Sequence, residues 1–172
     1  GAEAIVSTAS GCGVMIKDYG ELLKDDPAYF KKAQRISELA RDVSEVLEAE
    51  DLGVFNDSTN KLATAVHCPC TLSHGQKCEG TVERILERIG LPLVPTSEKH
   101  LCCGSAGTYS LFQPGISQRL LDRKLAALSD GKPEQIVTAN IGCQLHLASR
   151  SEVPVRHWIE LLDGDGDPDL EK

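Results

Sequence analysis

The chain has 172 residues, a formal net charge of -8 and no dense Lys/Arg tract, which argues against a nucleic-acid or anionic-membrane partner. Hydrophobic residues make up 41% of the sequence and aromatic residues only 4%, so the chain can bury an aliphatic core. No run of 18 apolar residues occurs, which excludes a transmembrane helix. The N-terminal residues show no signal-peptide pattern, which favours a cytoplasmic protein if Gly1 is the native start.

Hydrophobic patterning predicts strands alternating with helices, which is typical of an α/β fold with a mostly parallel sheet and helices on both faces. In chain order, the predicted elements are a strand over 4–8, a helix over 29–48, a turn-rich link over 51–60, a strand over 62–66, a helix over 76–89, a short strand over 91–95, a helix over 115–129, a strand over 135–140 and an acidic, mobile tail over 164–172.

Two parts of the sequence resemble each other. Residues 4–16, AIVSTASGCGVMI, align without a gap with residues 135–147, QIVTANIGCQLHL, and RDVSEVLE at 41–48 resembles RHWIELLD at 156–163. Each stretch is typical of a buried strand that delivers a cysteine at its C-terminal end. We therefore expect a fragment of a longer protein, with 1–57 as the end of a first unit plus a linker, and 58–163 as a complete second unit. Chance similarity between two buried strands is the alternative.

The seven cysteines are an odd number, and in a reducing compartment this favours metal or redox chemistry over a disulfide framework. Cys70, the Cys102-Cys103 pair and Cys143 each follow a predicted strand. Because the carboxyl ends of parallel strands share one edge, these four thiols should converge there as metal ligands. Gly104 and Gly107 would let backbone amides approach the bound group. The alternative for the adjacent pair is a buried thiol pair or a disulfide.

The pattern from Cys70 to His146, with HCPCTLSHGQK, HLCCGSAGTYS and ANIGCQLHL, resembles the cysteine-rich CCG domain. That domain recurs in heterodisulfide reductase subunits and in iron–sulfur subunits of flavin-linked dehydrogenases. The first-unit phrase TASGCGVMIKDYGELL resembles the CCG domain that precedes it in such subunits, so the division at 57/58 becomes one between two CCG-type domains. The resemblance covers nearly the whole chain and implies the C-terminal portion of such a subunit, without the two ferredoxin-like motifs.

The resemblance implies a [4Fe-4S]-type cluster, cubane or non-cubane, held by Cys70, Cys102, Cys103 and Cys143. The fullest CCG motif ends in a fifth cysteine, and His146 stands at that position here. His146 is open to several roles: a ligand, a neighbouring donor, a catalytic or quinone-binding group, or a plain surface histidine. In an isolated fragment we expect the cluster to be lost in air or replaced by an adventitious metal.

In the family, a flavin-containing subunit oxidises a 2-hydroxy acid such as glycolate, and electrons pass through iron–sulfur centres toward a quinone or another acceptor. The complex could lie against the inner face of the cytoplasmic membrane. The chain has no dinucleotide-binding fingerprint, so we expect no catalysis by this part alone. The alternative function is a zinc-binding structural domain, since the same ligand types hold Zn²⁺. A thiol–disulfide enzyme is a weaker alternative, because no C-x-x-C motif is present.

The other candidate residues carry weaker expectations. Cys68 should point away from Cys70, because alternate residues of an extended chain face opposite sides. Cys78 is expected in the core, and Cys12 is expected to bind nothing without the rest of its unit. His67 could line the cleft or have a structural role, and the same holds for His74 and His100.

Overall fold

The computed structural model describes residues 1–55 and 62–163, so part of the predicted link and the whole predicted tail lie outside the described residues. The strands are β1 (Ile5–Ser7), β2 (Ala40–Asp42), β3 (Thr64–His67), β4 (Gln135–Thr138) and β5 (Val155–His157). The helices are α1 (Ser10–Lys17), α2 (Tyr19–Leu22), α3 (Phe30–Leu39), α4 (Val43–Ala49), α5 (Thr81–Arg88), α6 (Tyr109–Phe112), α7 (Pro114–Ser129) and α8 (Ile141–Ala148), with helical turns η1 (Gly53–Phe55), η2 (Thr71–Gly75) and η3 (Trp158–Leu162).

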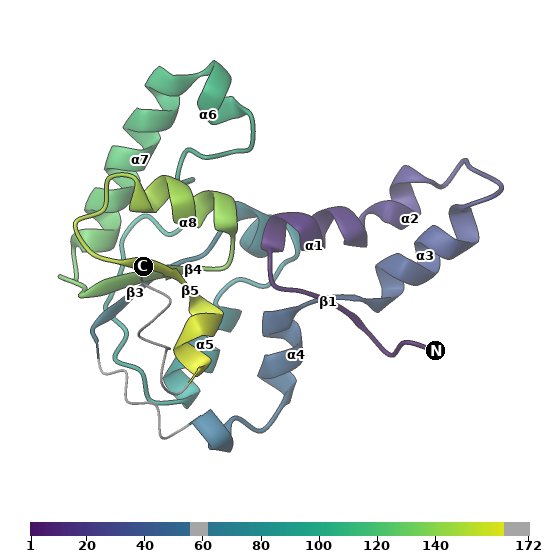
Figure 1. Ribbon diagram of the computed structural model, residues 1–172, viewed down its shortest axis with the longest axis horizontal. Coiled ribbons are helices and arrows are strands. Elements are labelled where there is room, and N and C mark those ends of the chain that lie inside the picture. The colour runs from purple at the N-terminus through teal and green to yellow at the C-terminus, as the bar shows by residue number, and fades with distance from the viewer. Residues whose placement is uncertain (56–61, 164–172) are drawn as a thin grey trace.

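The strands form two small parallel sheets, and the chain is of mixed α/β class, as predicted (Figure 1). β1 pairs with β2, and β3, β4 and β5 form the second sheet in that order. In the second sheet Thr64 lies opposite Gln135 and His67 lies opposite Thr138, so β3 and β4 end level with each other. This register brings the two segments that follow these strands to the same edge of the sheet.

The β3–β4–β5 sheet separates two clusters of buried apolar side chains. Val66 and Val137 belong to a cluster with the inward side of α5, whereas Ala65 and Ile136 belong to a cluster with the inward sides of α7 and α8. Successive strand residues point to opposite faces, which explains the alternation. The residues of β3 and β4 are buried throughout, as expected for short parallel strands covered by helices, whereas those of β5 are half-buried.

The single helix predicted over 29–48 is wrong, because β2 interrupts it between α3 and α4. The apolar periodicity continues through the break, but Ala40 to Asp42 are extended and pair with β1. Asp42 then begins α4 with a capping box, in which its side chain accepts from the Ser44 backbone N–H and the Glu45 carboxylate accepts from the Asp42 backbone N–H. Strand pairing plus a strong cap therefore outweighs the helical pattern.

Two further predicted elements are shorter than expected. The strand at 91–95 is reduced to an isolated bridge between Thr64 and Leu93. The helix predicted over 76–89 begins only at Thr81, because Gly80 lies in the left-handed region with a φ of 73°. The helix predicted over 115–129 is confirmed by α7, and the predicted strands at 62–66 and 135–140 correspond to β3 and β4.

None of the helices in residues 1–55 and 62–163 combines the length and the hydropathy needed to cross a membrane.

The core on the α5 side of the sheet gives the first prediction. Leu86 has no exposed surface and packs in that core, whereas Leu111 on α6 is 76% exposed. Replacing Leu86 with Ala should lower the free energy of unfolding by about 2–5 kcal/mol, because apolar burial is lost and a cavity remains. Denaturant titration measures this, with Leu111→Ala as the matched control. Equal effects of the two substitutions would contradict the assignment of this core.

Candidate metal centre

Three segments deliver the four predicted cysteines. Cys70 immediately precedes η2 after the end of β3, and Cys143 lies in the first turn of α8 after the end of β4. Cys102 and Cys103 lie on the loop between the bridge at Leu93 and α6, and not at the end of a strand as predicted. The convergence at one sheet edge thus involves two strand ends and one long loop.

The structure brings the four sulfurs into a continuous series of contacts. The Cys102 side chain interacts with the side chains of Cys70 and Cys103, and Cys103 also interacts with Cys143, as their mutual effects on pKa show. All four thiols are free, with Cys103 buried and the other three half-buried. The seven cysteines form no disulfide in the described structure, so the predicted convergence is observed without a bridge.

Charge is distributed unevenly along this series of thiols. Hydrogen bonds from the Cys103 and Cys70 thiols lower the pKa of Cys102, and the hydrogen bond from Cys103 lowers the pKa of Cys143. The pKa values of the Cys70 and Cys103 thiols are raised instead, because donating to Cys102 favours their protonated form. The pKa of each of these thiols therefore depends on its thiol neighbours.

His67 joins this group. Its imidazole nitrogen and the sulfurs of Cys103 and Cys143 lie within 4.8 Å of one another, close enough to ligate one metal ion. His67 is 1% exposed, and neither of its ring nitrogens has a hydrogen-bond partner in the described structure. The Oγ1 of Thr138, its neighbour across the β3–β4 ladder, is likewise buried without a partner. Unpartnered buried polar atoms are rare and costly, so this edge of the sheet is prepared for a ligand.

Gly104 holds the Cys102-Cys103 loop close to α7. Its φ is 95°, and an added Cβ would lie 2.4 Å from the Ser117 carbonyl oxygen, so a side chain does not fit. Its backbone N–H donates to the Cys102 sulfur at 3.3 Å. Gly107 differs, because an added Cβ would meet nothing within 4 Å, although its φ is 60°. Of the two predicted glycines, only Gly104 contacts a thiol.

His146 contacts the back of the same loop. Its Nε2 lies 3.2 Å from the Ser117 hydroxyl, which donates to the Gly104 carbonyl oxygen at 2.8 Å. In the described structure His146 is not part of the group formed by His67, Cys103 and Cys143. Its hydrogen bonds thus connect α8 to α7 and to the Cys102-Cys103 loop, which is the arrangement of a supporting donor.

Asn140 positions Cys143 and also links the two sheets. Its side-chain oxygen accepts from the backbone N–H groups of Gly142 and Cys143 and so caps α8. Its side-chain nitrogen donates to the Ser10 hydroxyl, which lies 2.7 Å from the Thr71 hydroxyl beside Cys70. The first helix of the chain thereby contacts both strand-end segments of the thiol cluster.

The remaining cysteines lie apart from the cluster. Cys78 is buried in the core near α5, as expected, and Cys68 packs against the same core with its pKa raised to about 12, mainly by burial. Cys12 is exposed on α1. His74 and His100 are exposed as well.

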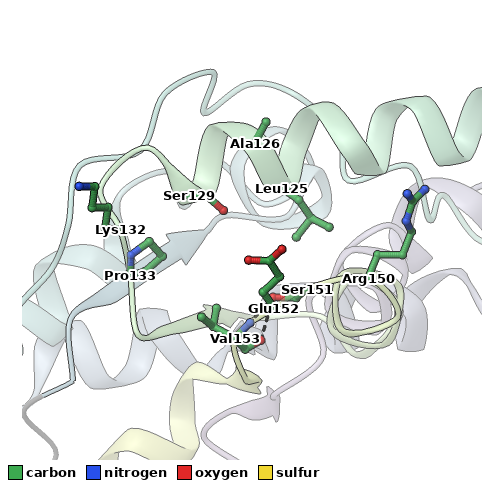
Figure 2. A pocket seen from close by; sticks show the side chains of 9 residues that line it. All are labelled: Leu125, Ala126, Ser129, Lys132, Pro133, Arg150, Ser151, Glu152 and Val153. Atoms are coloured by element: carbon green, nitrogen blue, oxygen red, sulfur yellow. Dashed lines mark hydrogen bonds between the residues drawn. The ribbon is translucent and has the colours of Figure 1, made fainter.

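A pocket of about 480 Å³ lies elsewhere, between the end of α7, the turn before β4 and the segment that joins α8 to β5 (Figure 2). Its polar lining includes Lys132, Arg150 and Glu152, and no cysteine or histidine lines it. It is at the amino end of β4, whereas the thiols are at the carboxyl end. The pocket is therefore not part of the thiol site.

The CCG model of cysteine-rich domains matches residues 64–148, a range that contains His67 and the four converging cysteines. The chain belongs to this family of cysteine-rich proteins. It is 53% identical, over 95% of its own length, to the glycolate oxidase iron-sulfur subunit of Escherichia coli K12, and it spans 40% of that relative.

Two lactate utilization A proteins are also similar. The chain is 31% identical to the protein of Bacillus licheniformis and 32% identical to that of Bacillus velezensis, in each case over 94% of its own length and 71% of the relative's. The resemblance drawn from the sequence motifs is thus confirmed at the level of the family.

The sequence alone does not decide between a cleft position and a structural role for His67. A signal for it exists, since it ends a buried β-branched run and stands three residues before Cys70. Only the register of β3 against β4, which places it beside the Cys103 and Cys143 sulfurs, distinguishes it from the nearby exposed His74.

The close approach at Gly104 gives the second prediction. Gly104→Ala should lower the free energy of unfolding by about 2–5 kcal/mol, because backbone strain and a clash with Ser117 combine. Gly107→Ala is the matched control, with only the left-handed conformation to strain it and an expected loss of about 1 kcal/mol. Thermal and denaturant unfolding of the metal-free chain measure both. A smaller loss for Gly104→Ala than for its control would refute the described packing.

The uneven charge gives the third prediction. In the reduced, metal-free chain at pH 7, iodoacetamide should modify Cys102 before Cys68, although both are half-buried. The pKa of Cys102 is lowered by its thiol neighbours, so its reactive thiolate is present, whereas burial raises the pKa of Cys68 to about 12. Peptide mapping by mass spectrometry follows the two sites. The difference should vanish in denaturant, and its absence in the folded chain would contradict the prediction.

Proposed function

We propose that Cys70, Cys102, Cys103 and Cys143 hold an iron–sulfur cluster of the [4Fe-4S] type. The supporting observation is that four thiols from three separate segments meet beside a buried, unpartnered imidazole. Soft thiolates suit iron–sulfur centres, and four of them match the usual ligand number of such a cluster. The residues present therefore fit the group that the family resemblance implies.

When bound, such a cluster accepts and releases single electrons. The chain supplies the surroundings that adjust it. The Gly104 N–H donates to the Cys102 sulfur. A ring nitrogen of His67 lies within 4.8 Å of the Cys103 and Cys143 sulfurs. Hydrogen bonds to ligand sulfurs stabilise their negative charge, and burial of Cys103 keeps water away. His146 supports the loop through Ser117, as its hydrogen bonds suggest.

We further propose that the chain is part of an electron-transfer subunit. The relatives include an iron-sulfur subunit of glycolate oxidase, and the chain spans only part of that protein. By similarity, a flavin-containing subunit would deliver electrons from a 2-hydroxy acid, and a quinone or another carrier would receive them. The complex would act on the cytoplasmic side, with at most peripheral contact with the membrane.

The chain also has the pattern of one and a half related units. Apart from α2 and α3, which lie between α1 and β2, the order β1, α1, β2 and α4 matches that of β4, α8, β5 and η3, and each set has parallel strands on either side of a Gly-Cys helix. Each closes with a capping box, at Asp42 with Glu45 and at His157 with Glu160. These matches support a division into the end of one CCG-type domain at 1–57, a complete domain at 58–163 and a tail at 164–172.

A zinc site is the second candidate. His67, Cys103 and Cys143 alone form a set of ligands that Zn²⁺ also favours. In that case the chain would be a structural or interaction domain without a redox role. The two candidates differ in metal content and colour, because an iron–sulfur cluster absorbs visible light and Zn²⁺ does not.

The fourth prediction tests the cluster directly. Anaerobic reconstitution with iron and sulfide should give about four of each per chain and a visible absorption band. Cys70→Ala, Cys102→Ala, Cys103→Ala and Cys143→Ala should each lose most of this iron. Cys12→Ala is the matched control, because Cys12 is exposed and apart from the cluster. Metal analysis and EPR of the reduced protein give the result.

Two outcomes would decide against the cluster. Stoichiometric zinc in a colourless protein that takes up no iron would favour the structural domain. Full iron uptake in the four ligand variants would show that the cluster is held elsewhere. For protein purified in air, we expect little iron, because exposed thiolates and clusters oxidise readily.

A further inference from the structure

Lys124 is a buried cation on α7. It is 1% exposed, and Leu121 and Leu128, one turn before and after it, pack in the same core cluster as Cys103. Residues three and four apart share one face of a helix, so Lys124 lies on the side of α7 that is directed at the thiol site. Its position is therefore defined by the packing of α7 against the second sheet and the Cys102-Cys103 loop.

The hydrogen bonds of Lys124 reach the loop that leads to the adjacent cysteines. Its ammonium donates to the carbonyl oxygen of Glu98 at 3.0 Å and to that of Lys99 at 3.4 Å. Both carbonyls belong to the segment immediately before Cys102. Together with Gly104 on the far side of the pair, Lys124 fixes the loop at two points.

These contacts leave the charge of Lys124 without a counter-ion. Within the described part of the chain no carboxylate forms an ion pair with it, and the Glu98 carboxylate is paired with Arg123 instead. A buried ammonium that lacks an anionic partner is strongly unfavourable, so such groups are normally paired. Among the described residues, this buried charge therefore has no ion-pair partner.

Thiolates at the thiol site would supply the negative charge that acts on Lys124. Burial lowers the pKa of Lys124, whereas negative charge on Cys70, Cys103 or Cys68 raises it. Glu98 acts in the same direction as the thiols but less strongly. An anionic centre held by the thiolates would therefore stabilise the ammonium that burial disfavours.

We propose that Lys124 is a positioning and charge-balancing residue for the thiolate centre: it fixes the loop before Cys102 and supplies the counter-charge for an anionic group bound by the cysteines. This inference rests on the proposed function, and it adds a residue that neither the cysteine motif nor the matches to relatives assigns. A centre with four thiolate ligands carries net negative charge, which increases when it is reduced. A fixed cation nearby therefore favours the reduced state.

The experiment compares two neutral variants with two charged or exposed controls. Lys124→Met removes the charge and the hydrogen bonds, and Lys124→Gln removes the charge but keeps a donor for the Glu98 carbonyl. Lys124→Arg retains the charge. Lys31→Met removes the same charge from an exposed position on α3 and controls for net charge.

Two measurements are made on the whole chain. The first is the midpoint potential of the reconstituted protein, followed by EPR or visible absorption. Both neutral variants should favour the oxidised state by about tenfold, which is about 59 mV more negative for a one-electron couple. The second is the affinity of the reduced, metal-free chain for Cd²⁺, followed by the thiolate charge-transfer band. It should fall by about tenfold in both neutral variants and stay near the wild-type value in Lys124→Arg and Lys31→Met.

The outcomes separate this inference from the proposed cluster. If the wild type loads iron and sulfide but the neutral variants keep its potential and its Cd²⁺ affinity, the role of Lys124 is refuted and the cluster stands. If the wild type loads no iron and sulfide, the cluster is refuted, and the Cd²⁺ titration alone decides whether Lys124 balances a thiolate-bound metal. Failure of both neutral variants to fold without metal would assign Lys124 a purely structural role and overturn the inference, as would a wild type that binds neither probe.

Discussion

The parallel pairing of β3 with β4 is the constraint on which the site depends. Because His67 and Thr138 are opposite each other at the ends of these strands, the segments that carry Cys70 and Cys143 leave the sheet side by side. A slip of one residue would exchange the two faces of each strand and move His67 away from the Cys143 sulfur. Buried apolar side chains on both sides of the sheet fix the register of these short strands.

The third part of the site comes from a loop, and a loop needs other means to hold it in place. α7 provides them along one of its faces. Ser117 packs closely against Gly104, and its hydroxyl donates to the Gly104 carbonyl oxygen. Two turns further on, the Lys124 ammonium donates to the Glu98 carbonyl oxygen, in the segment before Cys102. The adjacent cysteines are thereby held from both sides of the pair. Rigid surroundings of this kind let thiolates that repel one another remain close enough to share one ligand.

Much of this arrangement follows from the sequence by physical rules. Buried β-branched runs predicted β3 and β4, and the rule that parallel strands end at one edge predicted the approach of Cys70 to Cys143. The rule failed at 91–95, where Pro92 and Pro95 leave few donors for a ladder and only one bridge forms. It also could not identify His67 or Lys124, because their importance arises from burial, and burial of a polar side chain depends on the tertiary structure. The helix predicted over 29–48 failed because the local periodicity does not reveal that β1 is available as a pairing partner for Ala40 to Asp42.

The two sheets contact each other through reciprocal polar interactions. Asp42, at the end of β2, is fully buried and accepts from Gln76, next to the segment that carries Cys70. His157, at the corresponding place at the end of β5, has its Nε2 2.9 Å from the Thr8 carbonyl oxygen, which precedes the Gly-Cys turn of α1. Since both residues also cap the helical turn that follows, each strand end is fixed by its own cap and by a contact with a segment that follows a strand of the other sheet. The Asp42 contact is buried and the His157 contact is exposed, and such directional polar contacts restrict the relative orientation of the segments that they join. The orientation of α1 against Asn140 and Thr71 is therefore set by the same residues that terminate the edge strands, and the thiol site lies where the two sheets meet.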